Sequence, residues 1–558
     1  MSWVDDSLLL GCKTRLAALG IGWKGLEIMP VLSIAAGLFL AFTLQLVVYR
    51  AWLHPLSKIP GPVMNSVFNF PYIWRNNIRG LFVFDSVQVH RKYGPIVRIG
   101  PERILVDGEI AWPQVFSRRK ADQGQFEKMM PTQPVMGNSM TNARYHVHLR
   151  QRRHISPAFS DASIKQQEPV VKGYIDLLMD RLQKVAEKGE PVNMVNWLNC
   201  TTFDIAGDLV FTESFRSLRN SAAHPWFAEI MESVRYISFQ RFLDYYPLVR
   251  KLASLFVSTL GGKESPGRSH AKQKAQKRMD LGEEGTQGRK DMVSYMLRKT
   301  RDGQVVMRPE EVLENSVSLI VAGSETMSSA LCAFWFYLAK NPRVYERLAK
   351  EIRRAFPSED EISMQKASQL EYLQACISEA LRVYPPAAET PSRVSPGALI
   401  EGVYIPRGTL ITVFQWATFR NPKHFREPDS FIPERWLSSS HPHYEERFKD
   451  ENHAVFQPFS FGPRDCIGKN LALNELRLII SRILFKFDYE LSEGQDDWHT
   501  KQRAFLMWDK GPLMVRFKKR QMTVGEASCG KSGKSGKSGK SGKSGKSTLR
   551  FLKMDNAA

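Results

Sequence analysis

The sequence predicts a mainly α-helical protein with a smaller β region and a single N-terminal transmembrane helix. Residues 31–49 form an apolar run that would span about 28 Å as a helix, which matches the hydrocarbon core of a bilayer. Most of the chain beyond this run repeats its apolar residues with helical spacing. Residues 96–99 and 103–106 have the pattern of short strands.

The composition is that of a globular protein, and it argues against several functional classes. Of the 558 residues, 43% are hydrophobic and 24% are charged. The six cysteines are far apart and form no CxxC pair, which argues against a zinc cluster or a disulfide framework. The net charge of +21 suits nucleic acid, an anionic membrane or an acidic protein partner. Because the basic residues do not cluster with aromatic residues, we expect no nucleic-acid binding.

Composition divides the chain into five segments. We expect an N-terminal segment at 1–28 that could lie at the membrane interface, a transmembrane anchor at 29–50, a proline-rich hinge at 51–62, a catalytic domain at 63–520 and a disordered basic Gly-Lys-Ser tail at 521–558. The alternative for the apolar run is a buried core helix. Basic residues flank the run on both sides, so the charge pattern does not decide the orientation of the anchor.

One long helix is expected over residues 309–340. A proline suits its first turn, and Asn341 followed by a proline stops it. Gly323 lies in its middle, where glycine costs about 1 kcal/mol relative to alanine. A local widening of the helix, close to Glu325 and Thr326, would give that cost a functional reason. The alternative is a helix that packs through a small residue, with its glutamate in solvent.

The most informative stretch of the chain is residues 459–468. Five residue types stand there at fixed spacing, namely Phe459, Gly462, Arg464, Cys466 and Gly468. The apolar run that follows predicts a buried helix beginning near the cysteine, and a helix N-terminus favours a thiolate. The segment resembles, without a substitution, the haem-thiolate signature of the cytochrome P-450 monooxygenases. The alternative is a buried structural cysteine beside a turn.

The resemblance implies the cytochrome P-450 fold, with haem b between the long central helix and the helix after the cysteine loop. Cys466 would be the ligand of the iron, and its thiolate would favour cleavage of the O–O bond. Gly462 and Gly468 would leave room for the macrocycle, and Phe459 belongs to the same signature. Arg464 would reach a haem propionate as a charged donor.

The same resemblance assigns the middle of the long helix to oxygen chemistry. Gly323, Glu325 and Thr326 match the oxygen-binding motif of the family. Thr326 would donate a hydrogen bond during oxygen activation, and Glu325 would help to relay protons.

A second group of charged residues is expected to be structural. Glu379 and Arg382 lie one turn apart on a helix, a spacing that usually gives only a weak surface pair. In the family, these two positions and Arg435 match a buried three-residue cluster. We therefore expect the cluster to support the fold behind the haem and to take no part in redox chemistry.

Three further residues are expected to bind the haem propionates. Arg393 matches a strand arginine that often has this role. Arg152 occupies the usual place on a helix, but His148 stands where the family pattern has tryptophan. Imidazole can still donate to a carboxylate, so we keep His148 as a candidate. The alternative for both helix residues is a solvated basic face.

The substrate is expected to contact four largely apolar regions with a few polar side chains. These regions are residues 129–135, 319–322, 387–390 and 505–508.

The resemblance covers about residues 50–520, and stretches such as 167–174 and 202–208 resemble the fungal branch that includes trichothecene and isotrichodermin hydroxylases. It implies a monooxygenase of secondary metabolism that uses O2 and oxidises an apolar terpenoid or polyketide. Electrons would come from NADPH-cytochrome P-450 reductase, with the anchor in the endoplasmic reticulum and the catalytic domain in the cytosol. The alternatives are a haem-thiolate isomerase or peroxide-using enzyme, and a membrane-anchored haem sensor or scaffold.

Overall fold

The computed structural model shows how these predicted elements are arranged. It describes residues 28–130, 139–222, 224–252, 266–283 and 288–520. The predicted interfacial segment, apart from its last residue, and the predicted basic tail lie outside the described residues. So do residues 131–135 of the first predicted substrate region.

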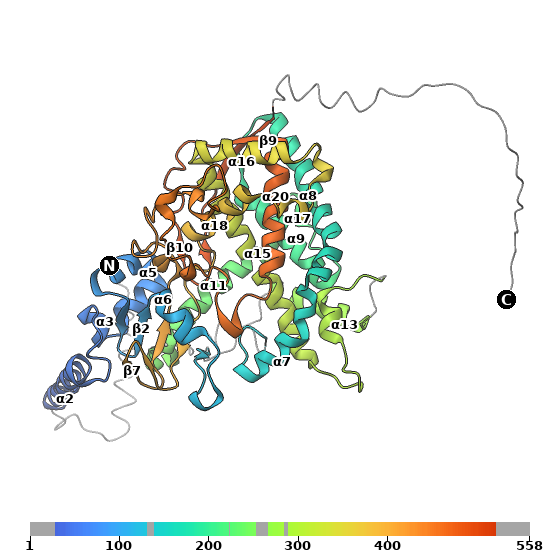
Figure 1. Ribbon diagram of the computed structural model, residues 1–558. Coiled ribbons are helices and arrows are strands. Elements are labelled where there is room, and N and C mark those ends of the chain that lie inside the picture. The colour runs from blue at the N-terminus through green and yellow to red at the C-terminus, as the bar shows by residue number, and fades with distance from the viewer. Residues whose placement is uncertain (1–27, 131–138, 223, 253–265, 284–287, 521–558) are drawn as a thin grey trace, which may run out of the picture.

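Helices make up most of the body, as the sequence predicts (Figure 1). Those before the central helix are α3 (Val63–Val67), α4 (Phe70–Ile73), α5 (Phe82–Tyr93), α6 (Gly108–Ala111), α7 (Tyr145–Ile155), α8 (Asp161–Lys188), α9 (Met194–Phe211), α10 (Ser217–Asn220), α11 (Pro225–Asp244), α13 (Pro266–Asp280) and α14 (Met292–Leu297). The central helix and those after it are α15 (Pro309–Ala339), α16 (Pro342–Ala355), α17 (Met364–Ala367), α18 (Glu371–Val383), α19 (Gln415–Thr418) and α20 (Lys469–Lys486).

The strands form one larger sheet and three small ones. The larger sheet has the order β1-β2-β8-β5-β3. It contains both strands that the sequence predicts, at residues 96–99 and 103–106. Its members are β1 (Ile96–Gly100), β2 (Arg103–Val106), β3 (Glu127–Lys128), β5 (Arg393–Val394) and β8 (Leu410–Thr412). The small sheets are formed by β4 (Val192–Asn193), β9 (Phe487–Leu491) and β12 (Met514–Lys519), by β6 (Ala398–Ile400) and β7 (Val403–Ile405), and by β10 (Arg503–Ala504) and β11 (Trp508–Asp509).

Helix α15 runs through the centre of the body, where α9, α18 and α20 pack around it (Figure 1). Its bounds agree with the sequence prediction, because a proline starts it and Asn341 with the next proline stops it. Arg150 of α7 forms an ion pair with the buried Glu311 in its first turn, at 2.5 Å. Acidic side chains at this end also suit the helix dipole.

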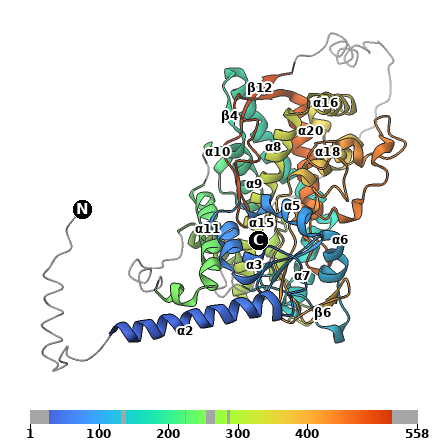
Figure 2. The same cartoon turned by 90° about the vertical axis from the view of Figure 1, so that its left-hand side faces the viewer.

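The N-terminal helix α2 (Ile28–Val48) continues into a π-helical turn, Tyr49–Leu53, and projects from one side of the body (Figure 2). Residues Ser33–Leu53 have a mean hydropathy of 1.7, and none of this stretch is buried, so it is a candidate membrane span. Helix α15 is also long and apolar, but 78% of its most apolar stretch is buried inside the protein, as expected of a core helix.

The proline-rich hinge is docked on the body. The amide of Arg98 in β1 donates to the carbonyl of Pro60 at 2.8 Å, and Leu56 is fully buried. A Cβ at Gly61 would lie 2.1 Å from the carbonyl oxygen of Arg98, so only glycine allows this approach. The hinge therefore fixes where the chain leaves α2 and enters the catalytic body.

Candidate functional site

A cavity of about 420 Å³ lies among α9, α15, α18, α20 and the loop before α20. Its lining is mostly apolar, which suits a flat macrocycle and an apolar small molecule. Six of the predicted site residues line it, namely Gly323, Thr326, Phe459, Arg464, Cys466 and Gly468. The structure thus brings the cysteine loop and the middle of the long helix to one cavity.

The loop around Cys466 is held by backbone geometry. Gly462 has a φ of +77°, and a Cβ there would lie 2.1 Å from the carbonyl oxygen of Phe116. Gly462 is therefore required by packing against protein, not by room for a macrocycle. The amide of Cys466 donates to the carbonyl of Phe459 at 2.8 Å and closes the turn. At Gly468 a Cβ would meet nothing closer than 3.7 Å, so the cavity is open there.

Cys466 is the exposed cysteine of the described part of the chain, and its exposure is to the cavity. The other three described cysteines, Cys200, Cys332 and Cys376, are buried. Although the thiol of Cys466 faces the cavity, the surrounding protein keeps it from bulk water, which raises its pKa, and the amide of Gly468 opposes that shift. A bound metal ion would supply the positive charge that a thiolate needs in such a place.

Three cations lie close together beside the cavity of Cys466, and one of them, Arg464, lines it. Arg464 forms an ion pair with Glu127 at 3.2 Å, and Arg393 is buried with its Nε lacking a hydrogen-bond partner among the described residues. Lys128, next to Arg393 across the β3–β5 pair, donates to the carbonyl of Thr141 at 2.6 Å. Burial, together with the positive charges of Arg393, Arg464 and Arg241, lowers the pKa of Lys128 to about 7.

This cluster has more positive than negative charge, so two carboxylates would stabilise it. The cations, the cavity-facing thiol and the open space at Gly468 together fit haem. Lys128 was not a candidate from sequence, because nothing in its neighbourhood along the chain marks it; only strand pairing brings it beside Arg393.

The two candidates on α7 contact the cysteine loop itself. Arg152 donates to the carbonyl and the carboxylate of Asp465, at 2.5 and 2.6 Å. The ring nitrogens of His148 lie 3.0 Å from the carbonyl of Met140 and 3.1 Å from that of Pro463. Both contacts are with acceptors, so they compete with any bond from His148 to a propionate. A direct role of either residue in haem binding stays a prediction.

Helix α15 presents Gly323 and Thr326 to the cavity. A Cβ at Gly323 would meet nothing closer than 3.7 Å, so glycine leaves space there. The helix is α-helical throughout this stretch, and the predicted local widening is wrong: the missing side chain, not a changed backbone, gives the room. The hydroxyl of Thr326 donates to the carbonyl of Ala322 at 2.6 Å, one turn back.

Glu325 does not line the cavity. Its side chain is 1% exposed and forms an ion pair with Lys510, whose side chain is 3% exposed. Lys510 also donates to the hydroxyl of Ser329 at 2.9 Å, and that hydroxyl donates to Oε1 of Glu325 at 3.3 Å. Oε2 of Glu325 is buried without a hydrogen-bond partner in the described structure. The sequence offered no signal for Lys510, which lies far along the chain after β11.

The predicted structural cluster is assembled behind the cavity. Arg382 donates to both carboxylate oxygens of Glu379, at 2.8 and 2.9 Å, and Arg435 donates to one of them at 3.2 Å. All three side chains are fully buried. Burial alone would raise the pKa of Glu379, but Arg382 and Arg435 outweigh it and lower that pKa. The carboxylate is therefore ionised, and the pairs hold α18 to the loop that carries Arg435.

The predicted substrate regions fall on three cavities. Leu319, Ala322, Ala387 and Thr390 line the cavity of Cys466. Residues 505–508 line a small cavity beside it, and Met129 lines another.

Glu475 of α20 also lines the Cys466 cavity, and the sequence analysis missed it. It is 5% exposed, and burial raises its pKa to about 8. An isolated glutamate in an amphipathic helix gives no sequence signal of such a shift.

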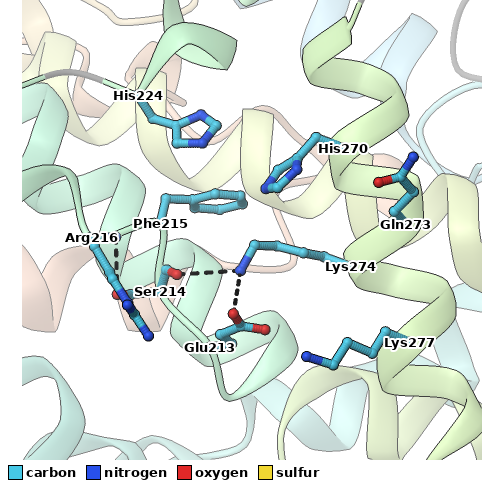
Figure 3. Close-up of a pocket in the computed structure, with 9 residues that line it drawn as sticks. All are labelled: Glu213, Ser214, Phe215, Arg216, His224, His270, Gln273, Lys274 and Lys277. Atoms are coloured by element: carbon cyan, nitrogen blue, oxygen red, sulfur yellow. Dashed lines mark hydrogen bonds and ion pairs between the residues drawn. The ribbon is translucent and has the colours of Figure 1, made fainter.

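A separate open cavity of about 340 Å³ lies between the end of α9 and α13 (Figure 3). The ring centroids of His224 and His270 are 5.3 Å apart there, and Lys274 forms an ion pair with Glu213 at 2.8 Å. It shares no lining residue with the cavity of Cys466, so it is not part of the thiolate site.

Comparison with known proteins agrees with this geometry. The family model of cytochrome P450 matches residues 59–517. The cytochrome P450 monooxygenase astJ of Aspergillus oryzae is 38% identical over 492 residues, which is 87% of this chain and 96% of that protein. The trichothecene C-15 hydroxylase of Fusarium sporotrichioides is 34% identical over 494 residues, 88% of this chain and 98% of that protein. The trichothecene C-4 hydroxylase of Trichoderma arundinaceum is 36% identical over 483 residues, which is 85% of this chain and 94% of that protein.

Proposed function

The chain belongs to the cytochrome P450 family, and from this premise we propose that it hydroxylates or otherwise oxidises an apolar terpenoid or polyketide intermediate of fungal secondary metabolism. As a P450 monooxygenase of this family it uses haem b. The observation that carries the proposal is the placement of Cys466: its thiol opens into a mostly apolar cavity whose wall includes Gly323 and Thr326 of α15.

Named residues would hold the cofactor. Cys466 would ligate the iron through Sγ, and Arg393, Arg464 and Lys128 would bind the propionates. The haem supplies, when bound, the iron at which O2 is activated. In the overall reaction one oxygen atom enters a substrate C–H bond and the other leaves as water, with two electrons from NADPH and two protons.

The chain's own contribution is to place substrate and to deliver protons. The apolar lining excludes bulk water, which limits wasteful release of peroxide. The hydroxyl of Thr326 now donates to the carbonyl of Ala322; rotation about its side-chain bond would turn that proton into the cavity. Glu325 is held by Lys510 outside the cavity lining, so it would act behind Thr326.

The partner and the location follow from the same premise. P450 monooxygenases generally take electrons from a redox partner, and we propose NADPH-cytochrome P450 reductase for this chain. The exposed apolar helix at Ser33–Leu53 supports a membrane anchor, and we propose the endoplasmic reticulum as its location, with the body in the cytosol. The net charge of +21 would favour docking of an acidic partner surface.

The proposed substrate class rests on two observations. The cavity is lined mainly by apolar side chains with few polar groups. Two similar proteins are named as hydroxylases of trichothecenes, and the chain is about as similar to these two as to astJ. We therefore propose a lipophilic secondary metabolite, and a comparison of metabolites between a deletion strain and its parent would identify it.

The decisive experiment uses the full-length holoprotein in a bilayer with reductase. With carbon monoxide and dithionite, the wild type should show the red-shifted Soret band of thiolate ligation. Cys466→Ala should lose that band, while the matched control Cys376→Ala should keep it, because Cys376 is buried outside the cavity. Oxygen uptake should require NADPH. A band retained in Cys466→Ala would overturn the ligand assignment, and turnover with peroxide alone would indicate the peroxide-using alternative.

A further inference from the structure

A small polar cavity adjoins the cavity of Cys466. Its volume of about 40 Å³ is enough for one small polar group. Thr390 and Pro391 line both cavities, so the two are neighbours. The polar side chains around it include Arg103, Arg241, Glu389, Asn76, Tyr72 and Tyr245. An apolar molecule in the larger cavity could therefore extend one polar group past Thr390.

Arg103 brings a fixed positive charge to this place. It is 7% exposed, and its guanidinium donates to the hydroxyls of Ser392, Thr412 and Tyr245, at 2.7, 2.9 and 2.7 Å. These hydroxyls are neutral, so they orient the guanidinium and leave its charge uncompensated. Tyr72 lies beneath it, with the ring centroid 5.2 Å from Cζ.

Arg241, near the end of α11, adds a second cation, and Glu389 adds one carboxyl. In the part of the chain that the structure describes, neither arginine forms an ion pair with a carboxylate; Glu389 accepts a hydrogen bond from Asn76 at 3.3 Å. Two cations therefore face one carboxyl, an excess of one positive charge. Burial also raises the pKa of Glu389, although Arg103 and Arg241 oppose it, and a protonated Glu389 would increase the excess.

We propose that this polar cavity is a subsite for a carboxylate on an otherwise apolar substrate, with Arg241 and Arg103 as its donors. The proposal rests on the proposed monooxygenase function and adds a chemical class: a lipophilic carboxylic acid. Arginine suits this role because its planar guanidinium matches a carboxylate with two parallel N–H donors.

A haem propionate is the other carboxylate that could use these arginines. Of its expected donors, Arg464 lines the larger cavity, and Arg393 and Lys128 lie beside Arg464. Arg241 and Arg103 line the small cavity instead, although the charge of Arg241 also acts on Lys128. We assign the two arginines to the substrate carboxylate because the small cavity adjoins the larger one at Thr390 and Pro391, and the rate of haem loss in Arg241→Gln tests the propionate alternative.

The test compares decanoic acid with methyl decanoate as probes on the full-length holoprotein in bilayer discs. Isothermal calorimetry gives the dissociation constants, and perturbation of the Soret band reports binding beside the haem. The variant is Arg241→Gln, because Arg103 holds three hydroxyls in place and its loss could unfold the sheet. The matched control is Arg235→Gln on the same helix, whose arginine pairs with Asp509 outside the cavity.

The wild type should bind the acid at least about tenfold more tightly than the ester, the low end for a hydrogen bond to a charged group. Arg241→Gln should remove most of this preference and leave ester binding unchanged, and Arg235→Gln should change neither. Glu389→Gln should not weaken binding of the acid, since it can only remove a like charge.

Three results would overturn the subsite: equal affinities in the wild type, equal weakening of acid and ester by Arg241→Gln, or faster haem loss in Arg241→Gln without loss of acid preference. The last result would assign Arg241 to a propionate. The carbon monoxide band and NADPH-dependent oxygen uptake are measured on the same samples. If both persist while acid preference is absent, the subsite fails and the monooxygenase function stands.

Discussion

Replacing Lys510 by methionine tests the buried ion pair with Glu325. The two side chains are 3% and 1% exposed, so water cannot replace the lost ammonium. After Lys510→Met, the carboxylate of Glu325 keeps only the hydroxyl of Ser329 as a hydrogen-bond partner. Breaking one side of a buried ion pair costs about 3–5 kcal/mol, and we expect a loss of unfolding free energy in that range.

The double variant separates the ion pair from general packing. Glu325→Gln alone leaves the ammonium of Lys510 buried beside a neutral amide, and it should also be strongly destabilised. Lys510→Met combined with Glu325→Gln leaves no buried charge. We expect this double variant to be more stable than either single variant, with a coupling energy above about 2 kcal/mol.

Urea unfolding of the holoprotein, followed by loss of the thiolate-type carbon monoxide band, gives the free energies. Lys501→Met is the matched control, because Lys501 pairs with Asp497 at 2.8 Å where both side chains are more than half exposed. An exposed pair of this kind contributes about 0–1 kcal/mol. Additive effects of Lys510→Met and Glu325→Gln, or a loss in Lys510→Met no larger than in Lys501→Met, would refute the reasoning.

Three further changes have defined outcomes. Glu379→Ala leaves the buried Arg382 without a carboxylate partner and Arg435 with Glu451 alone, so the yield of holoprotein in the carbon monoxide assay should collapse; a normal yield would contradict a structural role. Burial raises the pKa of Glu475 in the folded protein to about 8, well above its ordinary value of 4.5. The unfolded chain therefore loses this proton at lower pH than the folded protein does, and the free energy of unfolding falls as pH rises from the ordinary pKa to about 8. Glu475→Gln should remove this loss, raising stability by roughly 4–5 kcal/mol at pH 9, and an unchanged dependence of melting temperature on pH would argue against it. Thr326→Ala should keep the thiolate band but divert NADPH electrons to peroxide, measured as product per NADPH; unchanged coupling would remove the hydroxyl from the proton path.

The parts of the molecule that the sequence predicted are those encoded by neighbouring residues. The ends of α15 agree with the prediction because a proline and an Asn-Pro pair mark them locally. Residues 459–468 carry the signature in a single stretch, so the resemblance could single out Cys466, which the structure places at the cavity. The family model over residues 59–517 confirms the fold class that these local signals indicated.

The features that the sequence did not predict arise from contacts between distant segments. Lys510 reaches Glu325 from beyond β11, and Lys128 reaches Arg393 only through the pairing of β3 with β5. The raised pKa of Glu475 depends on its burial, which an amphipathic pattern does not report. From the sequence alone, each of these charged side chains would be expected on the solvent-exposed surface, because composition and periodicity carry no information about contacts with distant segments.

Two residues of α7 contact the cysteine loop directly. Arg152 donates to Asp465 and His148 contacts the carbonyl of Pro463, while a contact of either residue with the cofactor stays a prediction. Helix α7 thus supports the backbone on the N-terminal side of Cys466, where Gly462 also fits against Phe116. These contacts fix the backbone of residues 462–466 within the fold, and they hold the thiol of Cys466 toward the cavity.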